Sequence, residues 1–209
     1  MQLFTRTISL AGPFDEMMAF ATGMRELVSD RSGREIALWS VSFGAPIGTL
    51  IYSARVEGLA DLQAIGATLM GDAEYHAKLA AGRHLGTAPP VDGLSTPIHG
   101  ELGAVPPVGS VAVVTTAGMA NGKYAEAIGW GVEMAQYVES VTGSPTLFLM
   151  PDFGGFGQVT WISMTPDAAS ADAAGQKVNA DPGYLGRIAA AGDLFAQGSG
   201  LRSLLTRIA

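Results

Sequence analysis

One pattern occurs twice in this chain, and the repetition restricts the fold more than any other feature of the sequence. Gly33 and Gly143 stand 110 positions apart, and Asp72 and Asp181 stand 109 apart. One residue deleted at residues 154–157 accounts for the step, since a loop tip tolerates deletions well. Solenoid repeats run to about 20–50 residues, so a period this long indicates a duplicated domain.

Each copy is expected to hold the same order of strands and helices. The first copy is predicted to contain a strand at 2–10, a helix at 14–29, strands at 35–43 and 48–56, and helical segments at 59–70 and 73–84. A Gly/Pro-rich connection with a short strand at 96–99 is expected across residues 86–109. The second copy is predicted to contain strands at 111–116, 146–150, 158–164 and 201–208, and helical segments at 125–141, 165–179 and 181–191. Thr165 is the predicted N-cap of the 165–179 helix.

This order predicts an α+β fold made of two tandem ferredoxin-like (βαββαβ) repeats. The first repeat is placed at residues 1–100, a linker at 101–109 and the second repeat at 110–209. A ferredoxin-like unit has helices on one face of its sheet and leaves the other face exposed. We therefore expect the two sheets to pack face to face as an intramolecular α/β barrel.

The element order, the duplication and the paired Asp72-x-x-Tyr75 and Asp181-x-x-Tyr184 segments resemble the dimeric α/β-barrel superfamily over nearly the whole chain. That superfamily includes stress-responsive barrel proteins, antibiotic-biosynthesis monooxygenases, EthD- and NIPSNAP-like proteins and haem-binding chlorite dismutases. The resemblance implies a pocket between sheet and helices, often used for small apolar, aromatic or polyketide-like molecules. Asp72 and Asp181 themselves are interpreted as helix N-caps, and Tyr75 and Tyr184 as anchors of the helical turn.

The composition of the chain limits the classes of partner that it is expected to bind. Hydrophobic residues make up 48% of the 209 residues and charged residues only 15%, which favours extensive burial or a homo-oligomer. The net charge of −7 argues against a nucleic-acid partner or an anionic membrane surface. The chain has no cysteine, and its N-terminus lacks the features of a signal peptide, so a cytoplasmic location is expected.

Four aromatic residues are candidates for binding a substrate. Trp39, Tyr52 and Trp161 fall on predicted strands, Trp130 falls on a predicted helix, and Tyr52 and Trp161 occupy equivalent positions. Such residues either fill the core or line a pocket in which an indole N–H or a phenol orients a ligand.

His76 and Asp152 are the candidate catalytic residues. Asp152 follows a predicted strand and is the best-placed acid for a general base. His76 has Leu185 as its counterpart in the second copy, so it is not a duplicated structural feature. No metal-ligand motif is present, and we assign no metal site and no cofactor.

Three functions remain open on the sequence. The first is a small-molecule-binding protein or enzyme acting on an apolar or aromatic substrate, by acid–base chemistry or by cofactor-independent oxygenation. The second is a non-enzymatic oligomeric assembly protein. The third is a haem-binding barrel protein, in which a helical histidine would coordinate the iron.

Overall fold

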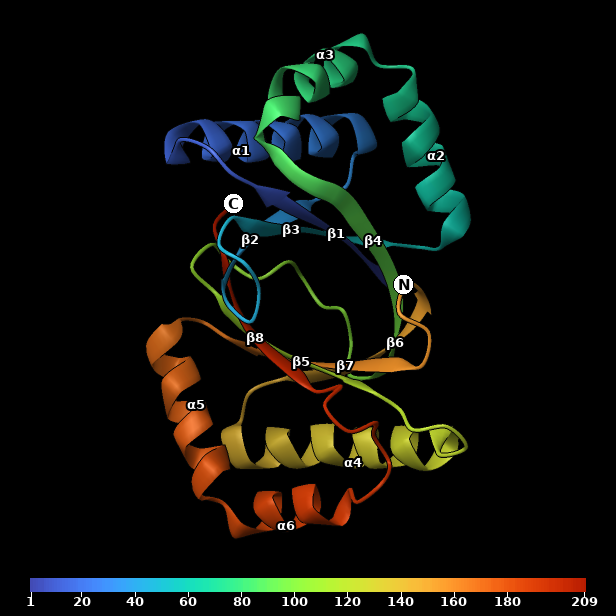
Figure 1. Cartoon of the computed structure of the whole chain (residues 1–209), viewed down its shortest axis with the longest axis vertical. Coiled ribbons are helices and arrows are strands. Elements are labelled where there is room, and N and C mark those ends of the chain that lie inside the picture. The colour runs from blue at the N-terminus through green and yellow to red at the C-terminus, as the bar shows by residue number, and fades with distance from the viewer.

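The computed structural model describes all 209 residues as an eight-stranded closed barrel with helices on two opposite sides (Figure 1). The first half contains β1 (Gln2–Leu10), α1 (Phe14–Ser32), β2 (Ile36–Phe43), β3 (Thr49–Val56), α2 (Leu59–Met70), α3 (Ala73–Gly82), the short 3₁₀ helix η1 (Arg83–Leu85) and β4 (Gly86–His99). The second half contains β5 (Val111–Gly118), α4 (Tyr124–Thr142), β6 (Thr146–Phe153), β7 (Gln158–Thr165), α5 (Ala168–Ala180), α6 (Pro182–Ala190) and β8 (Leu201–Arg207). None of these helices is both long enough and apolar enough to span a bilayer.

The strands follow one another around the barrel in the order β1-β3-β2-β8-β5-β7-β6-β4. Each half therefore forms a four-stranded ferredoxin-like sheet, and the halves join where β2 pairs with β8 and where β4 pairs with β6. Helices α1, α2 and α3 cover the outer face of the first sheet, and α4, α5 and α6 cover that of the second (Figure 1). The predicted fold class, two tandem repeats closing an intramolecular α/β barrel, is confirmed.

The repeated residues serve the same local purpose in both halves. Gly33 and Gly143 end α1 and α4 in the left-handed conformation, at φ 65° and 73°, which glycine adopts without strain. Asp72 accepts a hydrogen bond from the backbone N–H of Tyr75 at 2.8 Å, and Asp181 accepts the equivalent bond from Tyr184 at 2.7 Å. Both predicted N-caps are therefore confirmed.

Most predicted elements differ from the structure by a few residues at their ends, and two predictions need a correction. The sequence predicts only a short strand within the connection at 86–109, but β4 runs through Gly86–His99. Pro89 and Pro90 fit in it because they fall at a break in the register with β1, and this part of β4 has no second neighbouring strand that needs their missing N–H groups. The predicted cap Thr165 instead ends β7, where its hydroxyl donates to the carbonyl of Val111; Asp167 caps α5.

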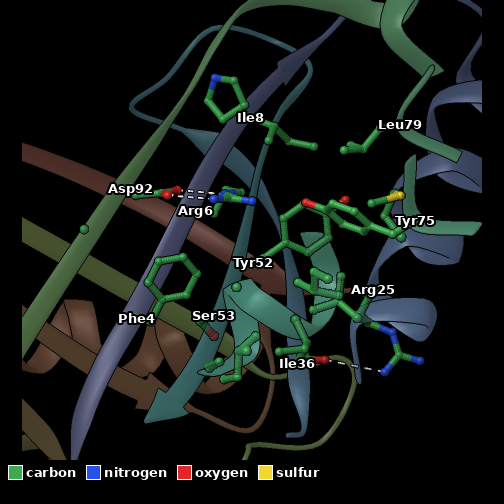
Figure 2. A pocket seen from close by; sticks show the side chains of 18 of the residues that line it. Phe4, Arg6, Ile8, Arg25, Ile36, Tyr52, Ser53, Tyr75, Leu79 and Asp92 are labelled. Carbon is green, nitrogen blue, oxygen red and sulfur yellow. Dashed lines mark hydrogen bonds and ion pairs between the residues drawn. The ribbon is translucent and has the colours of Figure 1, made fainter. Parts of the chain in front are cut away.

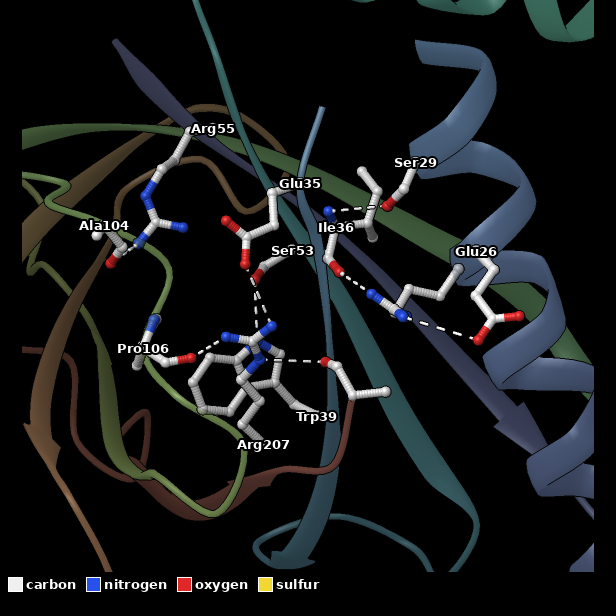
Figure 3. A network of polar contacts seen from close by, with 12 residues as sticks. Glu26, Ser29, Glu35, Ile36, Trp39, Ser53, Arg55, Ala104, Pro106 and Arg207 are labelled. Carbon is white, nitrogen blue, oxygen red and sulfur yellow. Dashed lines mark hydrogen bonds and ion pairs between the residues drawn. The ribbon is translucent and has the colours of Figure 1, made fainter. Parts of the chain in front are cut away.

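Part of the linker packs against the barrel interior, where Leu102 is buried and Val105 contacts the cluster around Trp39, and two arginines hold it there (Figure 3). Arg55 donates to the carbonyls of Gly103 at 2.6 Å and Ala104 at 2.9 Å. Arg207 donates to the carbonyl of Pro106 and is almost fully buried. A cluster of buried apolar side chains fills another part of the interior, and it consists of Ala37, Trp39, Val41, Ala112 and Leu205.

Candidate functional site

The outer face of the first sheet, which points toward the helices, is where the structure places a cavity. Side chains alternate between the two faces of a strand, so Arg6 on β1 and Tyr52 on β3, which are paired neighbours, point the same way. The cavity has a volume of about 940 Å³ and lies between this sheet and α1, α2 and α3 (Figure 2). Its wall is mainly apolar and includes Phe4, Ile8, Phe20, Met24, Leu62, Ile65 and Leu69.

A polar cluster interrupts the apolar wall. Arg6 makes two hydrogen bonds with Asp92, from Nε to Oδ1 and from Nη2 to Oδ2, both at 2.7 Å. The hydrogen bond from Arg6 to Asp92 raises the pKa of the guanidinium, and the nearby Tyr75 hydroxyl adds to this effect. Asp92 is the only carboxylate among the lining residues, so it is the only carboxylate base that could accept a proton from a molecule in the cavity.

Two tyrosines lie beside this ion pair (Figure 2). Tyr52 donates its hydroxyl to the carbonyl of Ala21 on α1 at 3.1 Å, and burial raises the pKa of the phenol. Tyr75 is positioned by the first turn of α3, where Asp72 caps the helix and receives a hydrogen bond from Arg31 at 2.6 Å. The phenol groups thus reach the cavity from the sheet and from the helix layer.

The equivalent space in the second half is filled by aromatic rings. Trp161 packs edge-on against Trp130 at 6.0 Å between ring centroids and against Phe195 at 5.8 Å, and it contacts Phe148 at 5.0 Å. A space of about 120 Å³ remains there. The difference in volume between the halves therefore comes from side chains and not from the topology of the strands.

The residue pairs that create this difference follow from the 109- and 110-residue spacing. The first half has Phe20, Tyr52 and Gly86 where the second half has the larger Trp130, Trp161 and Phe195. On the covering helices the sizes are reversed, because Leu59, Leu62 and Ile65 of α2 correspond to Ala168, Ala171 and Ala174 of α5. Helix α5 consequently packs against both β5 and β7, whereas α2 packs against β3.

The four aromatic residues predicted to bind a substrate do not share one site. Tyr52 lines the large cavity, and Trp130 and Trp161 belong to the filled second half. Trp39 points into the barrel interior, where its indole N–H donates to Ser53 at 2.9 Å (Figure 3). The structure brings Trp130 and Trp161 together and separates them from Trp39 and Tyr52.

The two predicted catalytic residues are not among those that line the large cavity. His76 lies on α3, exposed, with its Nε2 at 2.9 Å from the carbonyl of Met70. Asp152 lies near the end of β6 and accepts hydrogen bonds from Gln2 at 2.8 Å and Thr96 at 2.6 Å. A catalytic role for either residue remains a prediction.

Haem is a cofactor that the fold family implies, so its fit can be judged from the donors around the cavity. None of the three histidines, His76, His84 and His99, is among the lining residues. His84 and His99 are instead paired with Glu16 and Glu139. No group of three His, Asp or Glu side chains could hold a metal ion. The cavity lacks the histidine ligand that a haem site of this type needs.

Comparison with known proteins supports the same architecture. No protein-family model matches the sequence, and no curated protein matches it. An anthrone oxidase-like protein has a TM-score of 0.69 at 13% identity, covering 100% of this chain and 91% of its own. A candidate monooxygenase from Fusobacterium nucleatum has a TM-score of 0.67 at 10% identity, covering 100% and 92%.

The chlorite dismutase of Candidatus Nitrospira defluvii, in a mutant form, is a more distant neighbour. It has a TM-score of 0.54 at 14% identity, over 98% of this chain and 90% of its own. These likenesses establish the fold: the chain has the α/β-barrel fold of these structures, and one polypeptide supplies both ferredoxin-like units. The first unit contains a mainly apolar cavity of about 940 Å³.

Proposed function

We propose that the first-half cavity binds a flat, largely apolar molecule and that the protein oxygenates it without a bound cofactor. The observation that carries the proposal is the contrast between the two halves, about 940 Å³ against about 120 Å³. Ligand pockets are mostly apolar clefts of about 300–1,000 Å³ with a few placed polar groups. The first-half cavity has both properties. The second half has the same fold but leaves a space of only about 120 Å³.

The comparisons support the choice of reaction. Two of the similar structures are described as an anthrone oxidase-like protein and a candidate monooxygenase. A molecule of the anthrone type has a carbonyl group opposite an acidic C–H group. Such a molecule can lose a proton to give an enolate that reacts directly with dioxygen.

The polar cluster offers what this chemistry needs. Asp92 accepts the proton from carbon, while Arg6 and the Tyr75 hydroxyl stabilise the negative charge that develops on the substrate oxygen. Dioxygen then takes up the electrons and forms a carbon–peroxide bond. Loss of water from that peroxide leaves a new carbonyl group, so one ketone and one dioxygen give one quinone and one water.

Oxygen uptake with anthrone as substrate tests the proposal directly. Purified protein treated with a chelator should consume dioxygen and form the quinone, and Asp92→Asn should lower the rate by about 100-fold or more. Asp92→Asn should still bind a neutral aromatic probe, which separates lost chemistry from lost folding. No rate above the buffer reaction with the wild-type protein would contradict the proposal.

The same assay decides between Asp92 and the two acid–base residues expected from the sequence. His76→Ala and Asp152→Asn should retain the wild-type rate, because neither side chain lines the cavity. A large loss in either variant, with Asp92→Asn active, would place the chemistry outside the cavity.

Self-association is a second candidate, favoured by apolar residues at the two equivalent hairpin ends. Phe43 and Ile47 on the β2–β3 hairpin, and Phe153 and Phe156 on the β6–β7 hairpin, are each more than half exposed. Apolar groups gathered at such positions often contact another chain. Light scattering should detect a dimer or larger species at micromolar concentration, and Ile47→Asp with Phe156→Asp should shift it toward the monomer.

A further inference from the structure

The packing of α1 against the sheet does not require an arginine at position 25. Along α1, Ala21, Met24 and Val28 face the sheet, and position 25 follows Ala21 by one helical turn on the same side. The counterpart of Arg25 in the second half is Ala135, which is fully buried against that sheet. An alanine therefore satisfies the packing at this position, and the first half carries a charge instead.

The guanidinium of Arg25 is poorly satisfied by the protein. Its Nη1 is 3.5 Å from the carbonyl of Ile36, at the limit of a hydrogen bond, and its Nη2 is 3.9 Å from the carboxylate of Glu26. Its Nε is the only buried side-chain nitrogen or oxygen in the chain that lacks a hydrogen-bond partner. A buried donor without a partner destabilises the folded state, so the fold gains little from this arginine.

Arg25 is also part of the cavity wall. It lines the cavity next to Ile36, while the Arg6–Asp92 pair lies on the other side of Tyr52 (Figure 2). The lining contains three arginines, Arg6, Arg25 and Arg83, against the single acid Asp92. The cavity is thus locally cationic within a chain of net charge −7.

We infer that Arg25 binds an anionic group of the ligand, of the carboxylate type, at the end of the cavity between α1 and β2. The inference rests on the proposed binding function and specifies its substrate class: a flat apolar molecule with an anionic group remote from its reacting oxygen. A guanidinium supplies parallel N–H donors that match a carboxylate, and the two Nη groups of Arg25 make only long contacts with the protein. The apolar body of the ligand then lies along Ile65 and Tyr52, toward Arg6.

Two fluorescent probes with the same ring system test this inference. Anilinonaphthalene sulfonate carries an anionic group, and phenylnaphthylamine is the same molecule without it. Dissociation constants of both are measured for the wild type, for Arg25→Ala, which is the residue of the second half, and for Arg202→Ala. Arg202 is an exposed arginine of the second half and serves as the control.

The sulfonate probe should bind the wild type more tightly than the neutral probe does. Arg25→Ala should weaken binding of the sulfonate by about tenfold or more, as expected for a lost charge-assisted hydrogen bond. The neutral probe should change by less than about twofold, and Arg202→Ala should change neither. The melting temperature of Arg25→Ala should be equal to or above that of the wild type.

Other outcomes separate this inference from the proposed function. If Arg25→Ala weakens both probes equally or leaves both unchanged, Arg25 is not an anion-binding residue, although the cavity still binds aromatic molecules. If neither probe binds the wild type, the cavity is not a site for such ligands, and both proposals are overturned.

Discussion

Tyr52 and Trp161 donate hydrogen bonds to the same backbone position of the first helix in their respective halves. The Tyr52 hydroxyl reaches the carbonyl of Ala21 at 3.1 Å, and the Trp161 indole N–H reaches that of Gly131 at 2.9 Å. The backbone framework of the two copies has therefore been retained at this point. The larger indole and its aromatic neighbours fill the second half, whereas the phenol leaves the first half open.

The shared hydrogen bond predicts unequal effects of two similar substitutions. Tyr52→Phe removes one hydrogen bond with little change in volume, so the free energy of unfolding should fall by about 1 kcal/mol. Trp161→Phe removes the equivalent bond and also leaves a space among Trp130, Phe148 and Phe195, so the loss should reach about 2–3 kcal/mol. Denaturant unfolding of both variants measures the difference, and equal losses would show that the second half is not tightly packed.

A single substitution should close the first cavity. Gly86 lines the cavity and corresponds to Phe195, and a Cβ at this position would meet only the carbonyl of Arg83, at an ordinary contact distance of 3.6 Å. Gly86→Phe should therefore be tolerated and should weaken binding of phenylnaphthylamine more than tenfold, because the ring occupies ligand space. Gly175→Ala on α5, where a Cβ meets nothing within 4 Å, is the control and should bind the probe as the wild type does. Unchanged binding by Gly86→Phe would show that the probe occupies another site.

Two glycines of α4 should respond to alanine in opposite directions. A Cβ on Gly131 would lie 2.3 Å from the Phe148 ring, so Gly131→Ala should destabilise the protein by about 1–3 kcal/mol. A Cβ on Gly129 meets nothing within 4 Å, and Gly129→Ala should stabilise the helix by about 0.5–1 kcal/mol. Thermal and denaturant unfolding of the pair provide the test, and destabilisation by both would contradict the packing.

Acid should weaken both repeated helix caps. The N–H of Tyr75 and then Arg31 lower the pKa of Asp72 below its ordinary value, and the Tyr137 hydroxyl and then the N–H of Tyr184 lower the pKa of Asp181. A carboxylate whose pKa is lower in the folded state stabilises the fold above its unfolded pKa, and this contribution disappears as the pH falls through the folded value. Asp72→Asn should reduce the dependence of stability on pH below about 4, as measured by urea unfolding across that range.

The fold could be predicted from the sequence because the residues that indicate it occur in both halves. Turn glycines and helix caps at constant spacing, such as Gly33 with Gly143, are local features, and two copies of each identify the duplication. The full length of β4 could not be predicted, since Pro89 and Pro90 argue against a strand unless one edge is free. That free edge depends on the closure of the barrel, which no local pattern records.

The site was only partly predictable for a related reason. Aromatic residues on strands give no sign of whether they fill a core or line a cavity, and Tyr52 and Trp161 divide between the two. Arg6 and Arg25 carried a usable signal, because each places a charge on the apolar face of its element. The corresponding residues in the second half are uncharged, so a comparison of the two copies would have identified both arginines as candidate site residues. Asp92 lies within the unrecognised part of β4, and its pairing with Arg6 required the strand register.

The pairing of β2 with β8 and of β4 with β6 restricts how the sequence of this protein can change during evolution. Because each copy completes the hydrogen bonding of the other, neither can be lost without opening the ring. The densely packed second half stabilises the whole barrel. The first half, which contains the cavity, can therefore accept substitutions that would unfold an isolated unit of the same size. If the first-half cavity binds a ligand as proposed, its specificity is expected to change through substitutions around Tyr52, Gly86 and α2 and not through substitutions in the half containing Trp161.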